Sequence, residues 1–238
     1  MNKQKIQMVF FDAAGTLFDV RGSVGEIYAR FALRYGKQVD AEELQREFVR
    51  QFRRQPPMAF ARTLAHDERL ALEQDWWRTL VRQVFARFGE FAQFEDYFVE
   101  IFEFFRTADA WQVFADVKPT LAALQARGIR LGLISNFDAR LYDVLRGLQL
   151  REYFDSIHIS TEVGAAKPDP AIFRAALADN GLQPLHALHI GDGLTADVRG
   201  AEAVGLSAVW LDRSRSGGQA EFPNRVIELS PALIAGLR

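Results

Sequence analysis

The C-terminal half of the chain alternates between short apolar runs and amphipathic stretches, and this alternation is the feature that most restricts its fold. Strands are predicted at residues 129–134, 154–159, 187–190 and 207–211. Helices are predicted at residues 119–127, 139–148, 168–180 and 196–204. A further run at residues 6–11, apolar apart from Gln7, suits a buried strand of the same sheet. The predicted fold class is α/β, with a doubly wound parallel sheet.

Residues 22–110 contain no convincing strand pattern. Apolar and charged residues recur there at spacings of three and four, which predicts one helix after another. We therefore predict a core made of residues 1–20 and 113–238, with an all-helical cap domain inserted at residues 21–112.

Phenylalanines recur every three or four residues in the second part of this predicted cap. The favoured interpretation is the buried seam of a helical hairpin, and the alternatives are an aromatic-lined substrate cleft and a dimer face. We accordingly expect a monomer or a cap-mediated homodimer. The residues of the stripe are Phe85, Phe88, Phe91, Phe94, Phe98, Phe102 and Phe105.

Charge and composition exclude several classes of function. The formal net charge is -2, which gives no electrostatic footprint for nucleic acid or an anionic membrane. The chain has no cysteine, so disulfides, thiolate catalysis and cysteine-based zinc sites are excluded. Its few histidines show no metal-ligand spacing and are expected to be structural or at the surface. No apolar stretch is long enough to span a membrane, and a cytoplasmic protein is expected.

Polar side chains follow the predicted strands at the points where the strands end. Asp12 comes after the first strand, Ser135 and Asn136 after the second, and Asp192 after residues 187–190. Ligands of open parallel sheets bind at the carboxyl ends of the strands, so these residues are the candidates for a site. Asp197 lies at the start of the following helix.

This set of residues has a coherent chemistry. A carboxylate such as Asp12 can attack phosphorus and form an aspartyl-phosphate. Because the carboxylate and the phosphate repel each other, a cation is needed between them, and carboxylates such as Asp12 and Asp192 suit Mg²⁺. Ser135 and nearby backbone N–H groups can hold the phosphoryl oxygens, while Lys167 neutralises them.

The same residues resemble the four motifs of the haloacid dehalogenase superfamily, in their usual order. Motif one is similar to Phe10–Leu17 and motif two to Ile134–Asn136. Motif three is similar to residues 167–173, and motif four to residues 190–201. Many members insert a helical cap after motif one, which matches the predicted cap here.

A narrower resemblance is to the branch that includes a rhythmically expressed gene product of flies and a mammalian hydrolase domain-containing relative. It rests on Gly25–Tyr28, Trp76–Trp77 and Ile134–Asp138. The resemblance implies that Asp12 and Lys167 are catalytic. Thr16, Ser135, Asn136 and Lys167 would position the phosphate. The metal ligands would be Asp12, the backbone carbonyl of Ala14, Asp192 and Asp197, with Asp197 acting through a metal-bound water or by pairing with Lys167.

One position departs from the phosphatases of this superfamily. They carry a second aspartate two residues after the nucleophile, which protonates the leaving alcohol and then activates water, and here that position is Ala14. General acid–base help is typically worth about 10²–10⁴ in rate. Alkyl phosphates should therefore react slowly, whereas acyl or aryl phosphates need no proton on the leaving group.

Three alternatives follow from this departure. A metal-independent 2-haloacid dehalogenase also lacks that aspartate, but Asp192 would repel the substrate carboxylate. A phosphonoacetaldehyde hydrolase shares the motif Asp-x-Ala-Gly-Thr but needs a cap lysine, and only Lys37 is present. A catalytically weak protein that binds phosphate or a metal is the third. The preferred function is Mg²⁺-dependent hydrolysis of a small phosphorylated metabolite.

Overall fold

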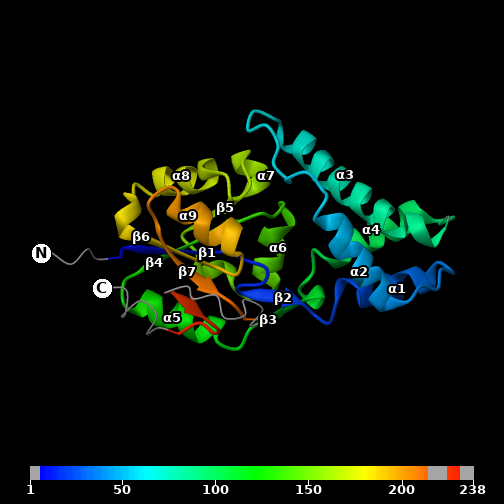
Figure 1. Ribbon diagram of the computed structural model, residues 1–238, viewed down its shortest axis with the longest axis horizontal. Helices are drawn as coiled ribbons and strands as arrows, with labels where there is room; N and C mark the ends of the chain where they lie inside the picture. Colours follow the sequence, from blue (N-terminus) through cyan, green and yellow to red (C-terminus); the bar gives the residue numbers. More distant parts are fainter. Residues whose placement is uncertain (1–5, 90, 214–223, 231–238) are drawn as a thin grey trace, which may run out of the picture.

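The computed structural model describes residues 6–89, 91–213 and 224–230. Its centre is a six-stranded sheet with the strand order β5-β4-β1-β6-β7-β8, and every neighbouring pair is parallel (Figure 1). The strands are β1 (Met8–Phe11), β4 (Arg130–Ser135), β5 (Ser156–Ile159), β6 (Ala187–Gly191), β7 (Ser207–Leu211) and β8 (Arg225–Val226). The predicted fold class is confirmed.

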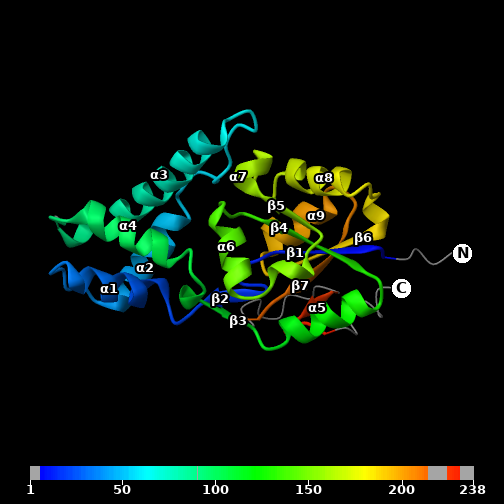
Figure 2. The same ribbon diagram turned by 180° about the vertical axis from the view of Figure 1, so that it is seen from behind.

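Helices cover both faces of the sheet, as Figure 2 shows from behind. They are α5 (Val117–Ala126), α6 (Arg140–Gly147), α7 (Ser160–Val163), α8 (Pro170–Asp179) and α9 (Gly200–Glu202). Because side chains alternate along a strand, β1 divides between two cores. Val9 and Phe11 are buried in one core with α5 and α6, while Met8 and Phe10 are buried in another with α8.

The helix predicted at residues 196–204 is not an ordinary α-helix over its whole length. Its first part is a π-helix, η5 (Leu194–Arg199), and only α9 continues it. The amide of Val198 accordingly donates to the carbonyl of Gly193, five residues earlier, at 3.3 Å. π-Helical turns are rare and occur mostly at functional sites.

A helical unit inserted after the first strand forms a second lobe (Figure 1). Its main helices are α1 (Val24–Arg34), α2 (Ala41–Phe52), α3 (His66–Phe85) and α4 (Phe94–Phe104). α1 has a capping box, in which Ser23 accepts from the amide of Glu26 and the Glu26 carboxylate accepts from the amide of Ser23. Among the described helices, none is long and apolar enough to cross a lipid bilayer.

A short antiparallel ribbon joins this unit to the sheet, and the sequence analysis missed it. β2 (Phe18–Val20) pairs with β3 (Trp111–Val113) at the two ends of the insertion. Each strand has three residues, too few for an alternating pattern to stand out.

The phenylalanine stripe packs inside the helical unit, as the favoured interpretation predicted. Phe85, Phe98 and Phe102 are buried in its core, and the other members pack partly buried against that core or its edges. The stripe does not lie on one helix: α3 ends at Phe85 and α4 begins at Phe94, so Phe88 and Phe91 lie between the two helices.

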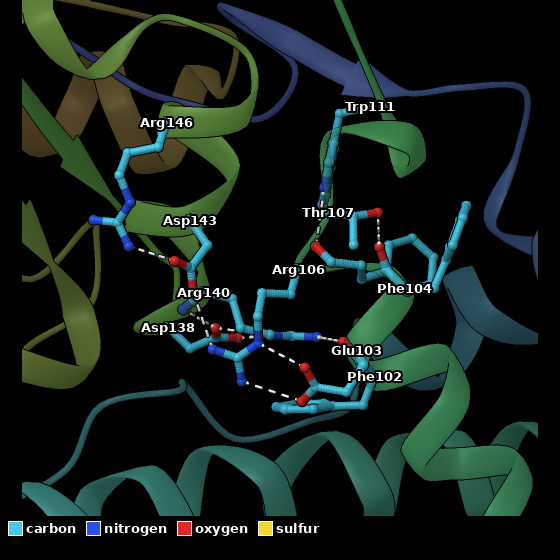
Figure 3. A network of polar contacts seen from close by, with 11 residues as sticks. Phe102, Glu103, Phe104, Arg106, Thr107, Trp111, Asp138, Arg140, Asp143 and Arg146 are labelled. Atoms are coloured by element: carbon cyan, nitrogen blue, oxygen red, sulfur yellow. Dashed lines mark hydrogen bonds and ion pairs between the residues drawn. The ribbon is translucent and has the colours of Figure 1, made fainter.

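A buried ion pair of the core makes hydrogen bonds to the helical unit (Figure 3). Arg140 donates from Nε and Nη2 to the two carboxylate oxygens of Asp138, at 2.9 and 2.7 Å, and from Nη1 to the carbonyl of Phe102 at 3.1 Å. Trp77 of α3 donates to the same Asp138 carboxylate at 2.6 Å. Burial raises the pKa of Asp138, but Arg140 outweighs it and holds the pKa below its ordinary value.

A second, more exposed set of charges lies beside this pair (Figure 3). Arg106, just after α4, donates to Glu103 at 2.9 Å and to Asp143 of α6 at 3.1 Å. Arg146 also pairs with Asp143. Exposed pairs of this kind contribute little to stability, so the hydrogen bonds of the buried Asp138–Arg140 pair to Trp77 and Phe102 are the stronger connection between the two lobes.

Replacing Asp138 by alanine should lower the free energy of unfolding by about 3–5 kcal/mol, because Arg140 would remain buried without its carboxylate. Urea denaturation monitored by tryptophan fluorescence measures this change. The matched control is Asp75→Ala, which breaks an exposed pair with Arg78 and should change stability by less than about 0.5 kcal/mol. Equal effects of the two substitutions would contradict the assigned role of Asp138.

Candidate active site

The candidate site lies where the central strands of the sheet end. Asp12 directly follows β1, Ser135 ends β4, and Asp192 directly follows β6. β1 is flanked by β4 on one side and by β6 on the other. The strand order reverses at this point, and ligands of open α/β sheets bind in the crevice there.

A buried lysine connects two of the predicted aspartates. The Nζ atom of Lys167 is 2.7 Å from Oδ1 of Asp12 and 2.5 Å from Oδ1 of Asp197. Burial lowers the pKa of Lys167, but the two carboxylates outweigh it and keep the pKa above its ordinary value. Lys167 is therefore charged, and it compensates part of the negative charge at the end of β1.

Asp197 has a further partner, His189 of β6, which sequence analysis did not place in the site. Nε2 of His189 lies 2.9 Å from Oδ1 of Asp197, and both side chains are buried. Burial raises the pKa of Asp197, but Lys167 and His189 together hold it well below its ordinary value. A histidine in an otherwise apolar buried strand needs a polar partner, and that was the available signal.

Asp192 lies on the exposed side of the same cluster. Thr16 donates from Oγ1 to Oδ1 of Asp192 at 3.3 Å. Partial desolvation and the negative charges of Asp12 and Asp197 raise the pKa of Asp192 to about 7. The three carboxylates thus lie close enough for one of them to hold its proton near neutral pH.

Two glycines make room for these carboxylates. Gly15 has a φ of +82°, and a Cβ atom there would lie 2.6 Å from Oδ2 of Asp192. A Cβ atom at Gly191 would lie 2.2 Å from Cγ of Asp197. The Asp197 carboxylate also accepts from the amide of Gly193 at 2.9 Å, so the π-helical turn fixes its position beneath the strand end.

Asn136 supports the loop that carries Lys167. Its Nδ2 donates to the carbonyl of Lys167 at 2.9 Å, and its Oδ1 accepts from the amide of Lys167 at 2.7 Å. The predicted phosphate-binding residues Thr16 and Ser135 are both buried at the same edge of the sheet. Ala14 is partly buried and lies on the wall of a neighbouring cavity.

Arg213 is a second residue that the sequence analysis did not single out. Its guanidinium donates to the carbonyl of Thr16 at 2.8 Å and 3.1 Å, and it pairs with Asp116 at 3.0 Å. These contacts hold the turn within motif one from a residue far along the chain. Nothing in the local sequence around Arg213 indicates this contact across nearly the whole chain.

The donor set suits a hard divalent cation. Asp12, Asp192 and Asp197 each offer a carboxylate oxygen, and these atoms lie within 4.8 Å of one another. Mg²⁺ prefers oxygen ligands of this kind, and a bound cation would relieve the repulsion that raises the pKa of Asp192. The residues present therefore fit a magnesium ion.

Comparison with known proteins identifies the family of this chain. The family model of haloacid dehalogenase-like hydrolases matches residues 6–205. This chain belongs to the haloacid dehalogenase-like hydrolase family. It is therefore an enzyme, a hydrolase whose substrate is a small molecule, and the family predicted from its motifs is confirmed.

Relatives of this hydrolase include members of the predicted branch. Haloacid dehalogenase-like hydrolase domain-containing protein 3 of Mus musculus is 33% identical over 211 residues, covering 86% of this chain and 81% of that protein. Rhythmically expressed gene 2 protein of Drosophila melanogaster is 31% identical over 218 residues, covering 84% and 81%. A phosphoserine phosphatase of Thermus thermophilus is 39% identical over 134 residues, covering 56% of this chain and 51% of that protein.

Solved structures share the fold over almost the whole chain. A HAD-hydrolase of Bacillus subtilis bound to magnesium superposes with a TM-score of 0.70 at 18% identity, covering 94% of this chain and 96% of that one. A 2-haloacid dehalogenase of Pseudomonas syringae superposes with a TM-score of 0.66 at 26% identity, covering 98% and 100%.

In the metal-free hydrolase, the contribution of Asp192 to stability should fall as the pH rises from about 4 to about 7. The folded protein keeps the Asp192 proton up to a pKa of about 7, whereas the unfolded chain loses it near pH 4. Asp192→Asn removes this difference, so in EDTA at pH 8 it should be more stable than wild type by roughly 1 kcal/mol, allowing for solvent screening.

Thermal unfolding of both proteins in EDTA at pH 4 and pH 8 measures the effect. The two should differ at pH 8 and converge at pH 4. Asp109→Asn, at an exposed aspartate in a 3₁₀-helix of the insertion, is the control and should show no such pH dependence. A gain for Asp192→Asn that is equal at both pH values would contradict the raised pKa.

Proposed function

We propose that this hydrolase is a phosphatase that cleaves a small phosphorylated metabolite through an aspartyl-phosphate at Asp12. The observation that carries the proposal is the cluster at the strand ends: three carboxylates within 4.8 Å, with Lys167 bonded to two of them. A site with so much negative charge is suited to hold a cation, and cation and lysine together attract a phosphoryl group.

The first step would form a bond between a carboxylate oxygen of Asp12 and phosphorus. The bond from phosphorus to the leaving oxygen breaks, and its electron pair departs with that oxygen. Lys167 would hold the negative charge of the phosphoryl oxygens, and Thr16 and Ser135 would orient them. Asn136 acts through Lys167, because both of its amide atoms bond the backbone of that residue.

The second step would be attack of water on the aspartyl-phosphate. Oxygen of water bonds to phosphorus, the bond to Asp12 breaks, and a proton is released. With Ala14 in place of a second aspartate, no carboxylate at that position removes this proton or protonates the leaving oxygen. Substrates with good leaving groups would therefore react fastest.

Magnesium would be held by Asp12, Asp192 and Asp197 together with the backbone carbonyl of Ala14. When bound, it supplies positive charge that lets the anionic nucleophile approach an anionic phosphate. The magnesium-bound structure of the Bacillus subtilis relative and the phosphoserine phosphatase of Thermus thermophilus support this choice of metal and reaction class.

A dehalogenase is the second candidate function. It is supported by Ala14 and by the similarity to the Pseudomonas syringae 2-haloacid dehalogenase. Asp192 argues against it, because the substrate carboxylate would meet a cluster that already carries excess negative charge. Lys37 gives no support to a Schiff-base mechanism, since it bonds the carbonyl of Phe88 and does not line the cavity beside Ala14.

Hydrolysis of 4-nitrophenyl phosphate tests the phosphatase proposal. We expect turnover in Mg²⁺, a loss of at least about 100-fold in EDTA, and a loss of at least about 10³-fold in Asp12→Asn. Restoring excess Mg²⁺ should recover the EDTA-treated wild type only. Release of halide from a 2-haloacid that is insensitive to EDTA, with no phosphate hydrolysis, would establish the dehalogenase instead.

Ala14→Asp should raise activity on alkyl phosphates. A carboxylic acid at this position can protonate the leaving alkoxide, and we expect a gain of about 10- to 100-fold in kcat with glycerol 2-phosphate. Ala14→Asn is the matched control, because asparagine has nearly the same volume as aspartate and its amide cannot act as a general acid. The interpretation of Ala14 fails if both variants are folded and gain equally.

A further inference from the structure

A cavity of about 510 Å³ adjoins the candidate site between the helical unit and the core. Ala14, two residues after the nucleophile, is part of its wall, and so are Asn136 and Ala166, which flank the site on the core side. This volume is in the range of small-molecule sites. The position at Ala14 makes the cavity the place where a leaving group would lie once its phosphate is at Asp12.

Aromatic rings form a continuous series along the cap side of this cavity. The ring centroid of Trp76 lies 5.9 Å from that of Phe52, and the ring centroid of Phe52 lies 5.5 Å from that of Phe48. The series continues from Phe48 to Tyr28 at 5.9 Å and from Tyr28 to Phe105 at 6.2 Å. All five rings line the cavity.

The series reaches the core beside the loop that carries Lys167. Phe105 lies 5.9 Å from Trp111, and Trp111 lies 5.9 Å from Phe137. Phe137 directly follows Asn136, the residue that holds Lys167. Aromatic walls therefore extend from the exposed end of α2 to the loop beside the candidate nucleophile, and a flat ring could make edge-to-face contacts along them.

Most polar side chains in this lining already have partners. Gln45 accepts from the amide of Gly25, and Gln55 bonds Gln83. Ser23 caps α1, and both amide atoms of Asn136 bond Lys167.

Charged groups in the lining also disfavour a leaving group that carries a carboxylate. Arg140 is the one cation among the described lining residues, and each of its three nitrogens donates to Asp138 or to the carbonyl of Phe102. Asp19 adds an exposed carboxylate to the wall. A substrate carboxylate would meet negative charge here and no unengaged guanidinium.

We infer that the preferred substrate is an aryl phosphate, the phosphate monoester of an uncharged phenol, whose ring occupies this cavity. The inference rests on the proposed phosphatase function and names its substrate class. It also accounts for Ala14: an aryl oxide departs with the electron pair of the broken P–O bond and needs no proton from the enzyme, and a methyl group keeps the wall apolar beside the ring.

Binding tests the cavity without requiring catalysis. In the Asp12→Asn variant with Mg²⁺, 1-naphthyl phosphate should quench tryptophan fluorescence and bind at least tenfold more tightly than inorganic phosphate. Phospho-L-serine, which carries a carboxylate, should bind no more tightly than inorganic phosphate. Equal affinities for 1-naphthyl phosphate and inorganic phosphate would overturn the inference.

Phe52→Ala tests the aromatic wall itself. Phe52 is 45% exposed, so its loss should leave the fold intact, and it should weaken binding of 1-naphthyl phosphate about three- to tenfold. Leu72→Ala is the matched control, at a residue of α3 that is 39% exposed and outside the cavity lining. An equal effect of the two variants would overturn the assignment of the ring to this cavity.

Turnover of acetyl phosphate separates the two proposals. It has a good leaving group and no ring, so a working phosphatase site hydrolyses it in wild type and Leu72→Ala alike. Hydrolysis that depends on Mg²⁺ and Asp12, without a preference for 1-naphthyl phosphate in kcat/KM, would leave the phosphatase standing and overturn the aryl class. Tight binding of 1-naphthyl phosphate without hydrolysis of either compound would overturn the phosphatase and, with it, the assignment of an aryl phosphate as substrate.

Discussion

The electrostatic balance at the carboxyl ends of β1 and β6 is the constraint on which the site depends. Three carboxylates lie within 4.8 Å of one another, and mutual repulsion on this scale would push them apart. Lys167 and His189 hold Asp197 ionised, and Lys167 also bonds Asp12. Asp192 bonds neither Lys167 nor His189, and its partial desolvation together with the negative charges of Asp12 and Asp197 raises its pKa to about 7. The arrangement is thus prepared for one additional cation.

This balance also explains the local backbone. Two of the carboxylates can approach the strand ends only because Gly15 and Gly191 have no Cβ atom. The π-helical turn then offers Asp197 an amide from Gly193 while directing its carboxylate toward Lys167. The sequence analysis predicted an ordinary helix here, because a π-turn differs from an α-helix by one inserted residue and leaves the apolar pattern nearly unchanged.

The parts of the structure that were predictable from the sequence are those with a periodic or ordered signal. Parallel strands buried on both faces read as apolar runs, and their carboxyl ends identified Asp12 and Asp192 before the sheet was known. The contacts of Arg213 and Asp138 were not predictable in the same way. Each contact joins segments that are distant in the chain and depends on a single side chain. Neither property leaves a pattern in a single sequence.

The ribbon of β2 and β3 was missed for a different reason. Its strands are held by their pairing with each other and by the rings of Phe18 and Trp111, whose centroids are 5.3 Å apart. This stabilisation is tertiary, so three-residue strands can form where local propensity alone predicts nothing. The ribbon fixes both ends of the insertion beside motif one, which is why the helical unit can place a wall so near to Ala14.

Three consecutive residues after β4 connect the loop that carries Lys167, the cavity and the helical unit. Asn136 bonds the backbone of Lys167, Phe137 ends the aromatic series, and Asp138 accepts from Trp77 of α3. A shift of the helical unit that moved Trp77 would therefore act on the segment that positions Lys167. Asp138 is completely buried and paired with Arg140, which anchors this segment in the core. The same short segment thus forms part of the cavity wall and supports the loop that carries Lys167.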